Sequence, residues 1–104
     1  MIAVAGLLQF KPEDRQAVLD GLKEVVRRSR QDPGCIDYWW SEDMETADAF
    51  RFFECWESQE LFDVHIAQPH EVAFGERNLK RITGATASFF EASPTAPVGL
   101  PSAG

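Results

Sequence analysis

Several residues and motifs that define large functional classes are scarce or missing in this chain. Its 104 residues include two cysteines, two histidines and one tyrosine, and no GxGxxG or GxxxxGK stretch. Without those glycine-rich motifs, a dinucleotide or nucleoside triphosphate site of that type is not expected. Cys35 and Cys55 show no CxxC spacing, and no secretion signal is recognisable, so we expect two free thiols in a cytoplasmic protein.

Basic residues and long apolar runs are also in short supply. Ten Lys and Arg stand against 17 Asp and Glu, which gives a formal net charge of −7. An acidic surface repels phosphate backbones and anionic lipid headgroups, so neither nucleic acid nor membrane is an expected partner. No stretch approaches the roughly 20 apolar residues of a membrane-spanning helix.

Aromatic residues, in contrast, are plentiful. Eight Phe, three Trp and one Tyr occur in a chain of single-domain size. Such a chain buries only roughly two-thirds of its surface on folding. The aromatic surplus favours an apolar ligand pocket or a buried interface between subunits.

The residue patterns predict a strand, a helix, two strands, a pair of helices and a final strand. Pro12 with two acidic residues after it opens the first helix, and Asp32-Pro33-Gly34 ends it. Thr83-Gly84 is expected to end the last helix. The predicted ranges are 2–10, 13–31, 35–41, 48–57, 58–67, 69–81 and 85–91. This order is typical of an α+β, ferredoxin-like split βαβ fold with a four-stranded antiparallel sheet.

The first strand predicts that the sheet is apolar on both faces. Ile2, Val4, Leu8 and Phe10 alternate with Ala3, Ala5 and Leu7. Helices on one face leave the other to be buried elsewhere, most simply against a second copy, so we expect a homodimer. The domain is expected to span residues 1–92, and the uncharged, proline-containing residues 93–104 to form a tail.

The two middle strands are expected to form a hairpin. Folding it about residues 42–48 places Cys35 opposite residue 55 or 56, and Tyr38 opposite residue 52 or 53. A slip of one residue would turn every side chain to the other face, so the facing across the two strands stays open. Within the second strand, alternate residues share one face: Phe50, Phe52, Glu54 and Trp56.

The two histidines lie five residues apart with Pro69 between them. Zinc-binding histidines on one helix stand four apart, and no third ligand is indicated, so no metal is expected. His65 is either a base that faces an apolar cavity or a buried structural residue whose ring pairs with a carboxylate such as Glu54. The residue pattern alone favours the structural role. Glu54 is either paired or at the rim of a pocket, and His70 is expected at a helix start or on the surface.

Two stretches resemble a known family. Residues 32–38, DPGCIDY, are similar to the PGCxxY strand opening of the antibiotic biosynthesis monooxygenase family. Residues 52–58, FFECWES, with Leu61, His65, Pro69 and His70 after them, resemble its ExWxS…L…H…PH signature. The resemblance covers about residues 2–92 and is nearest to the quinol monooxygenase members.

This resemblance implies a dimeric α+β barrel with a pocket between the sheet and the helices. Characterised members oxygenate polycyclic phenols, anthrones or quinols with dioxygen and without metal or flavin. A base removes a proton, the anion reduces dioxygen, and a dry pocket protects the intermediates. By position in the family, His65 is the expected catalytic base. The expected substrate contacts are Tyr38, Phe53, Glu54, Trp56 and Phe74.

The expected function is therefore a cofactor-independent monooxygenase acting on an aromatic quinol- or anthrone-like molecule. The alternative is a non-catalytic dimeric barrel that binds a hydrophobic small molecule, as stress-responsive relatives do. Haem degradation is less well supported, because the first strand lacks the asparagine of those enzymes. In addition, His65 and Gly75 stand near the places of their tryptophan and histidine. Neither the substrate nor the presence of activity follows from the sequence.

Overall fold

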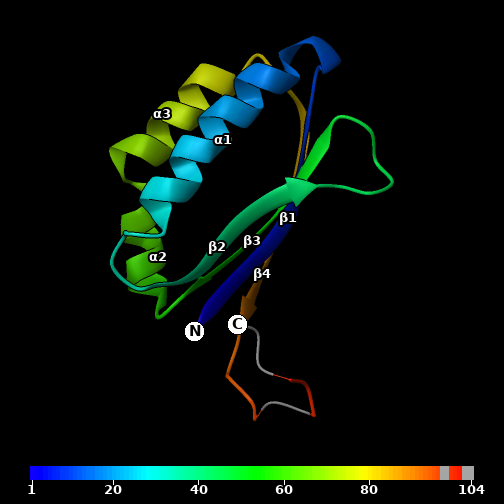
Figure 1. Cartoon of the computed structure of the whole chain (residues 1–104). Coiled ribbons are helices and arrows are strands. Elements are labelled where there is room, and N and C mark those ends of the chain that lie inside the picture. The colour runs from blue at the N-terminus through cyan, green and yellow to red at the C-terminus, as the bar shows by residue number, and fades with distance from the viewer. Residues whose placement is uncertain (97–98, 102–104) are drawn as a thin grey trace.

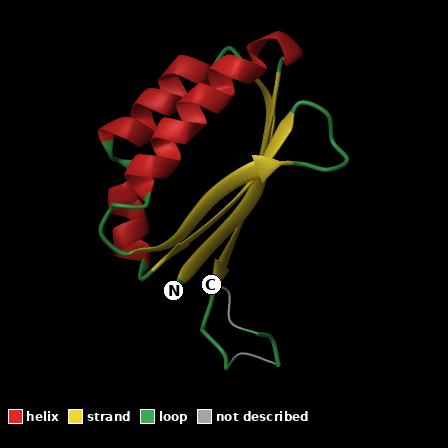
Figure 2. Cartoon of the chain, in the orientation of Figure 1, coloured by secondary structure: helices red, strands yellow, loops and turns green. Residues whose placement is uncertain are grey.

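The structure, a computed structural model, describes residues 1–96 and 99–101. Its elements, in chain order, are β1 (Ile2–Phe10), the short 3₁₀ helix η1 (Pro12–Asp14), α1 (Arg15–Ser29), β2 (Cys35–Glu42), β3 (Ala49–Trp56), α2 (Gln59–Ile66), α3 (Pro69–Asn78) and β4 (Ile82–Glu91) (Figure 1). The strands form one antiparallel sheet in the order β2-β3-β1-β4. All three α-helices lie on one face of it (Figure 2), so the predicted ferredoxin-like α+β fold is confirmed.

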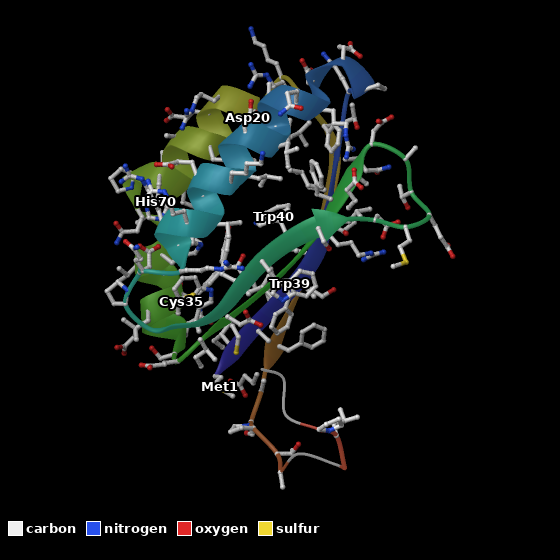
Figure 3. The ribbon with its side chains drawn as sticks, in the orientation of Figure 1. Met1, Asp20, Cys35, Trp39, Trp40 and His70 are labelled. Atoms are coloured by element: carbon white, nitrogen blue, oxygen red, sulfur yellow. The ribbon has the colours of Figure 1, made fainter. Side chains whose placement is uncertain are left out.

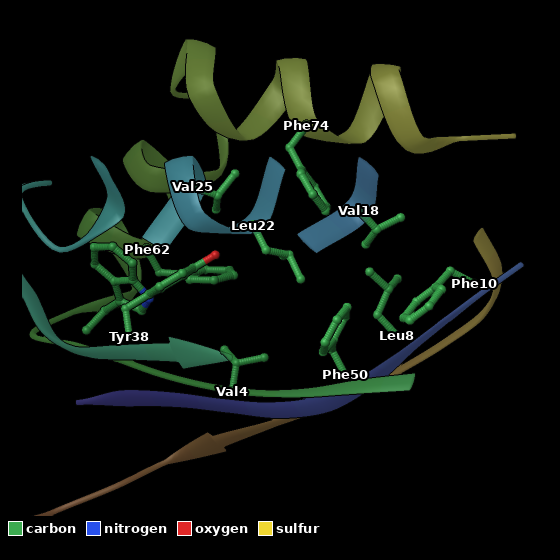
Figure 4. Close-up of a cluster of buried hydrophobic side chains, with 11 residues drawn as sticks. Val4, Leu8, Phe10, Val18, Leu22, Val25, Tyr38, Phe50, Phe62 and Phe74 are labelled. Carbon is green, nitrogen blue, oxygen red and sulfur yellow. The ribbon is translucent and has the colours of Figure 1, made fainter. Parts of the chain in front are cut away.

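The core lies between the sheet and the helices. Val18, Leu22 and Val25 recur at helical spacing and are almost fully buried on one side of α1. Beneath them, the inward side chains of the strands complete a continuous apolar cluster (Figure 4). At roughly 25 cal/mol per Å² of buried apolar surface, this cluster is the main favourable contribution to folding.

The turn after α1 is shaped by Gly34. Its φ of +80° lies in the left-handed region, which residues with a side chain rarely adopt. A Cβ at this position would stand 2.4 Å from Leu61 Cδ1 of α2. The turn therefore packs tightly against α2, and this contact fixes the loop that carries Asp32.

The β2–β3 hairpin differs from the predicted register by one residue. Cys35 pairs with Trp56 as expected, but Tyr38 pairs with Glu54 rather than with residue 52 or 53. The cause is a β-bulge between Cys35 and Asp37, which adds one residue to β2. As a result, Tyr38 and Glu54 lie on the same face, the one that the helices cover.

The last helix and strand also have different bounds from those predicted. α3 ends at Asn78, whose side-chain amide donates to the Phe74 carbonyl and whose oxygen accepts from Arg81. β4 starts at Ile82, because Gly84 does not break the chain but pairs with Gln9 of β1. The prediction that Thr83-Gly84 separates helix from strand was therefore wrong by about three residues.

The residue before β1 is hydrogen-bonded to the residue after β4. The Met1 amino group donates to the Ala92 carbonyl at 3.0 Å, and the Ala92 amide donates to the Met1 carbonyl at 2.9 Å. Residues 93–96 beyond β4 form neither helix nor strand. The predicted tail includes 97–98 and 102–104, which lie outside the described residues.

In the described part of the chain, no helix lies over the second face of the sheet (Figure 2). Trp39 of β2 pairs with Phe53 of β3, with ring centroids 6.1 Å apart, and Phe53 pairs with Ala5 of β1. Trp39 is 39% exposed and Phe90 of β4 is 54% exposed. This bare face therefore presents large aromatic groups to solvent in a single chain.

Among the described residues, no helix is long and apolar enough to cross a membrane.

Candidate functional site

Side chains from five segments converge at one end of the helical layer. Asp32 comes from the loop after α1, and His65 from α2. The others come from β2, β3 and α3: Tyr38, Glu54, Trp56, His70 and Glu71. Direct contacts join these seven side chains into one contiguous polar and aromatic cluster.

His65 lies at the centre of the cluster and has no exposed surface. α2 presents it there because the Ser58 hydroxyl caps the helix by accepting from the Leu61 amide at 3.2 Å. The imidazole stacks on the Trp56 ring at a centroid distance of 4.2 Å and meets the Tyr38 ring edge-on at 5.5 Å. The aromatic rings hold the imidazole plane and exclude water from it.

Asp32 joins the two histidines. Its Oδ2 lies 2.9 Å from His65 Nδ1 and 3.0 Å from His70 Nε2. A carboxylate oxygen accepts, so both nitrogens carry their protons in this arrangement, and a neutral His65 then has a bare lone pair on Nε2. His70 lies at the start of α3, one of the two positions expected for it, and from there its ring reaches the same carboxylate as His65. Figure 3 labels His70 on this helix.

Two more carboxylates face the other nitrogen of His65. Nε2 lies 3.6 Å from Glu54 Oε1 and 3.6 Å from Glu71 Oε2. Glu54 Oε1 already accepts from Trp56 Nε1 at 2.9 Å. Within residues 1–96 and 99–101, His65 Nε2 and Glu71 Oε2 are both buried without a hydrogen-bond partner. Buried polar atoms of this kind are uncommon and point to a binding or catalytic role.

Burial also changes the acid–base properties of the cluster. It raises the pKa of Glu71 to about 7, and the nearby charges of Glu54 and Asp32 add to the increase. Burial raises the pKa of Glu54 against the lowering effect of the Trp56 hydrogen bond. It lowers the pKa of His65, although the hydrogen bond and charge of Asp32 act the other way. Near neutral pH the imidazole is therefore favoured in its neutral form, as a proton acceptor.

The structure brings together four of the six residues that the sequence predicts for a site. Tyr38, Glu54 and Trp56 surround His65. Phe53, in contrast, follows the alternation of β3 onto the bare face, away from His65.

The sixth predicted residue, Phe74, is a buried core residue. Its ring packs against Gly21 of α1, where an added Cβ would lie 3.2 Å from it (Figure 4). Two residues of the cluster were not predicted from the sequence. Asp32 was assigned to a turn that ends a helix, and Glu71 was not singled out.

A groove of about 620 Å³ opens between α1 and β2, next to the cluster. Its apolar wall includes Leu22, Val26, Trp40 and Phe50, but its lining does not include His65. Figure 3 shows Trp40 between α1 and β2, with Trp39 on the other side of the strand. Trp40 Nε1 donates to the Tyr38 hydroxyl at 3.2 Å, so a hydrogen bond connects the groove wall to the ring beside His65.

Comparison with known proteins assigns the family. The family model "Antibiotic biosynthesis monooxygenase" matches residues 1–77, a range that contains every side chain of the cluster. The chain belongs to the antibiotic biosynthesis monooxygenase family. The predicted family is thereby confirmed.

A curated relative agrees in sequence over the same part of the chain. It is an uncharacterized protein of Synechocystis, 32% identical over 77 residues, which are 74% of this chain and 52% of the relative. The chain thus spans about half the length of this relative.

Several solved structures agree with this chain in fold. One crystal structure of an antibiotic biosynthesis monooxygenase is 27% identical, covers 90% of this chain and 100% of its own, and has a TM-score of 0.83. A Deinococcus radiodurans protein with a provisional assignment to this family gives 22% identity, coverages of 95% and 99%, and a TM-score of 0.86. A conserved protein from Methanosarcina mazei is 22% identical, covers 88% of this chain and 92% of its own, and has a TM-score of 0.82. The last two likenesses concern the fold alone.

Proposed function

We propose that this chain is a cofactor-independent monooxygenase that oxidises an aromatic quinol- or anthrone-like small molecule with dioxygen. Family membership supports the reaction class. The observation that carries the proposal is the buried imidazole of His65, whose Nδ1 hydrogen-bonds to Asp32 and whose Nε2 has no hydrogen-bond partner among the described residues. That arrangement suits a general base.

In this proposal, His65 Nε2 removes a phenolic or activated C–H proton from the substrate. The resulting anion is electron-rich and reduces dioxygen. One oxygen atom enters the substrate, and the other leaves as water with the two hydrogens that the substrate loses. The apolar rings of Tyr38 and Trp56 keep water away from the intermediates.

Glu71 gives the proton a path to solvent. Its side chain is 27% exposed, whereas His65 is fully buried, and its Oε2 lies 3.6 Å from Nε2. A carboxyl with a pKa of about 7 exchanges protons readily near neutral pH. Because His65 itself has no exposed surface, a substrate reaches Nε2 only when neighbouring side chains move aside.

Dioxygen consumption tests the proposal. Tag-free protein, stripped of metal with a chelator, is mixed with reduced menadione or an anthrone in an oxygen electrode. We expect dioxygen to disappear faster than in buffer, and heat-unfolded protein to give the buffer rate. A panel of such substrates that all react at the buffer rate would contradict the proposal.

A second candidate, a non-catalytic barrel that binds a hydrophobic molecule, is favoured by the groove beside α1. The groove is apolar, and its lining does not include His65. If the chain is a binding module, an added aromatic ligand should quench Trp40 fluorescence, and no dioxygen should be consumed. Loss of the quenching in Trp40→Phe would then locate the ligand in the groove.

We also propose that two copies pair through the bare face of the sheet. Trp39 of the edge strand β2 and Phe53 of β3 form an aromatic pair on this face, and Trp39 is 39% exposed in a single chain. Phe53→Glu would place a charge in that interface. We expect it to weaken the dimer by roughly 30-fold or more, the effect of losing an interface residue worth about 2 kcal/mol.

Analytical ultracentrifugation over a range of concentrations measures this effect. Val72→Glu is the control, because Val72 is an apolar residue, 45% exposed, that lies on α3 in the helical layer. The control should keep the dimer. A monomeric wild-type chain, or a Phe53→Glu variant with unchanged dimer mass, would show that the face is not the interface.

A further inference from the structure

We propose that Asp32, His65 and His70 bind one divalent first-row transition metal ion, with Zn²⁺ as the reference ion. The ligand atoms are Asp32 Oδ2, His65 Nδ1 and His70 Nε2, which all lie within 4.8 Å of one another. This site goes beyond the proposed oxygenation, and its existence does not depend on that activity.

The distances suit such an ion after a small opening of the cluster. Zn²⁺ binds imidazole nitrogen and carboxylate oxygen at about 2.0–2.2 Å, so tetrahedral ligands stand about 3.4 Å apart. The two histidine nitrogens now lie 2.9 and 3.0 Å from Asp32 Oδ2. For the ion to fit, each of these two contacts must lengthen by about half an ångström.

The partners of His65 support this assignment. When Nδ1 binds a metal ion, the ring carries its proton on Nε2 and donates it to a carboxylate or carbonyl, which fixes the ligand in place. Here Nε2 faces Glu71 Oε2 and Glu54 Oε1, each at 3.6 Å. His65 Nε2 and Glu71 Oε2 are also the two buried atoms of the cluster that have no hydrogen-bond partner in the described chain. In the metal-binding tautomer, Nε2–H could donate to Glu71 Oε2 once the 3.6 Å gap closes by about half an ångström, and this bond would satisfy both atoms.

The charges of the cluster favour a cation as well. Asp32, Glu54 and Glu71 are three carboxylates around two imidazoles. Among the described residues, their ion pairs are with histidine alone, and no Lys or Arg forms an ion pair with them. Buried carboxylates need a compensating charge or proton, and a divalent ion in their midst supplies it.

Two histidines and one carboxylate form a donor set with open coordination positions. Zinc enzymes use such a set with water at the fourth position, and non-haem iron enzymes use it as well. An ion can enter from solvent, since the side chains of Asp32 and His70 are 10% and 11% exposed. An ion on His65 Nδ1 would leave Nε2 protonated, and His65 would then be unable to act as the base proposed above.

Titration of Zn²⁺ into the chelator-treated, tag-free full chain tests the site by calorimetry. We expect one ion per chain, and Co²⁺ should give visible d–d bands at the same stoichiometry. Asp32→Asn and His70→Gln should each weaken binding by at least about 100-fold, because loss of an outer partner alone costs about 10–100-fold. Asp63→Asn, which changes an exposed carboxylate on α2 bonded to Gln59, should bind as wild type.

Imidazole NMR of the wild-type chain gives a test that does not depend on any variant folding. The chain has two histidines, so long-range ¹H–¹⁵N spectra show two ring systems. On adding Zn²⁺, His65 should change to metal on Nδ1 and a proton on Nε2, and His70 to metal on Nε2. Unchanged rings at saturating Zn²⁺, no binding above buffer, or wild-type affinity in both ligand variants would overturn the site. None of these outcomes bears on dioxygen consumption by the metal-stripped protein.

Discussion

Replacing His65 with glutamine is expected to lower dioxygen consumption with reduced menadione by about 10²–10⁴-fold, the usual contribution of a general base. Glutamine keeps a polar amide in the buried cluster but has no basic nitrogen. The variant also loses the imidazole Nδ1 that now lies 2.9 Å from Asp32 Oδ2. The oxygen electrode with metal-stripped protein measures the effect on kcat and KM separately.

The matched control is Asp63→Asn, an exposed change on the same helix. It should keep the wild-type rate. Circular dichroism of His65→Gln should show an unchanged fold, so that a lost rate reports chemistry. A folded His65→Gln variant that oxidises the substrate at the wild-type rate would remove His65 from the mechanism and leave the groove beside α1 as the place to look for it.

Trp56→Ala is expected to lower the free energy of unfolding by about 3–5 kcal/mol, the cost of emptying a large buried aromatic site. Trp56 has no exposed surface, stacks on His65 and meets Tyr38 edge-on. A small domain has a total stability of about 5–15 kcal/mol, so this variant would be close to unfolding at room temperature. Urea denaturation of both proteins at the same concentration measures the change, because any self-association would make the apparent stability depend on concentration.

Trp56→Phe separates packing from hydrogen bonding at the same position. Phenylalanine keeps most of the ring but leaves Glu54 Oε1 without the indole donor that now lies 2.9 Å away. We expect a loss of about 1–3 kcal/mol, the cost of a buried polar group left without its partner. A Trp56→Ala variant that is no less stable than Trp56→Phe would show that the aromatic stack contributes little.

The sequence was sufficient to predict the fold because its strongest patterns are local. The apolar stripe of α1 and the same-face alternation of Glu54 and Trp56 both depend on near neighbours in the chain. The bulge at Cys35 and Asp37 leaves no comparable pattern, and it moved Tyr38 by one position in the hairpin. Gly84 was misread for a similar reason: its place in β4 depends on pairing with Gln9, which is distant in sequence.

The site was only half predictable for the same physical reason. Glu54 and Trp56 share one face of a single strand, and a pairing of His65 with a carboxylate such as Glu54 was one of the alternatives that the residue pattern offered. Tyr38 lies on the neighbouring strand and was expected only from the family resemblance. Asp32, however, reaches His65 across 33 positions of sequence and His70 across 38. The four-residue spacing of metal-binding histidines holds for a single helix, and here Pro69 begins a second helix that turns His70 back to the first.

The tight turn at Gly34 limits how this part of the family can vary over evolution. A side chain at this position would clash with Leu61. The positive φ of the backbone would also be strained for any residue other than glycine. Pro33 beside it is exposed and so open to exchange, whereas a change at position 34 would displace the loop that presents Asp32. Contact with α2 thus restricts evolutionary drift at position 34 of this chain, and a replacement there is expected to displace the Asp32 carboxylate from the two histidines.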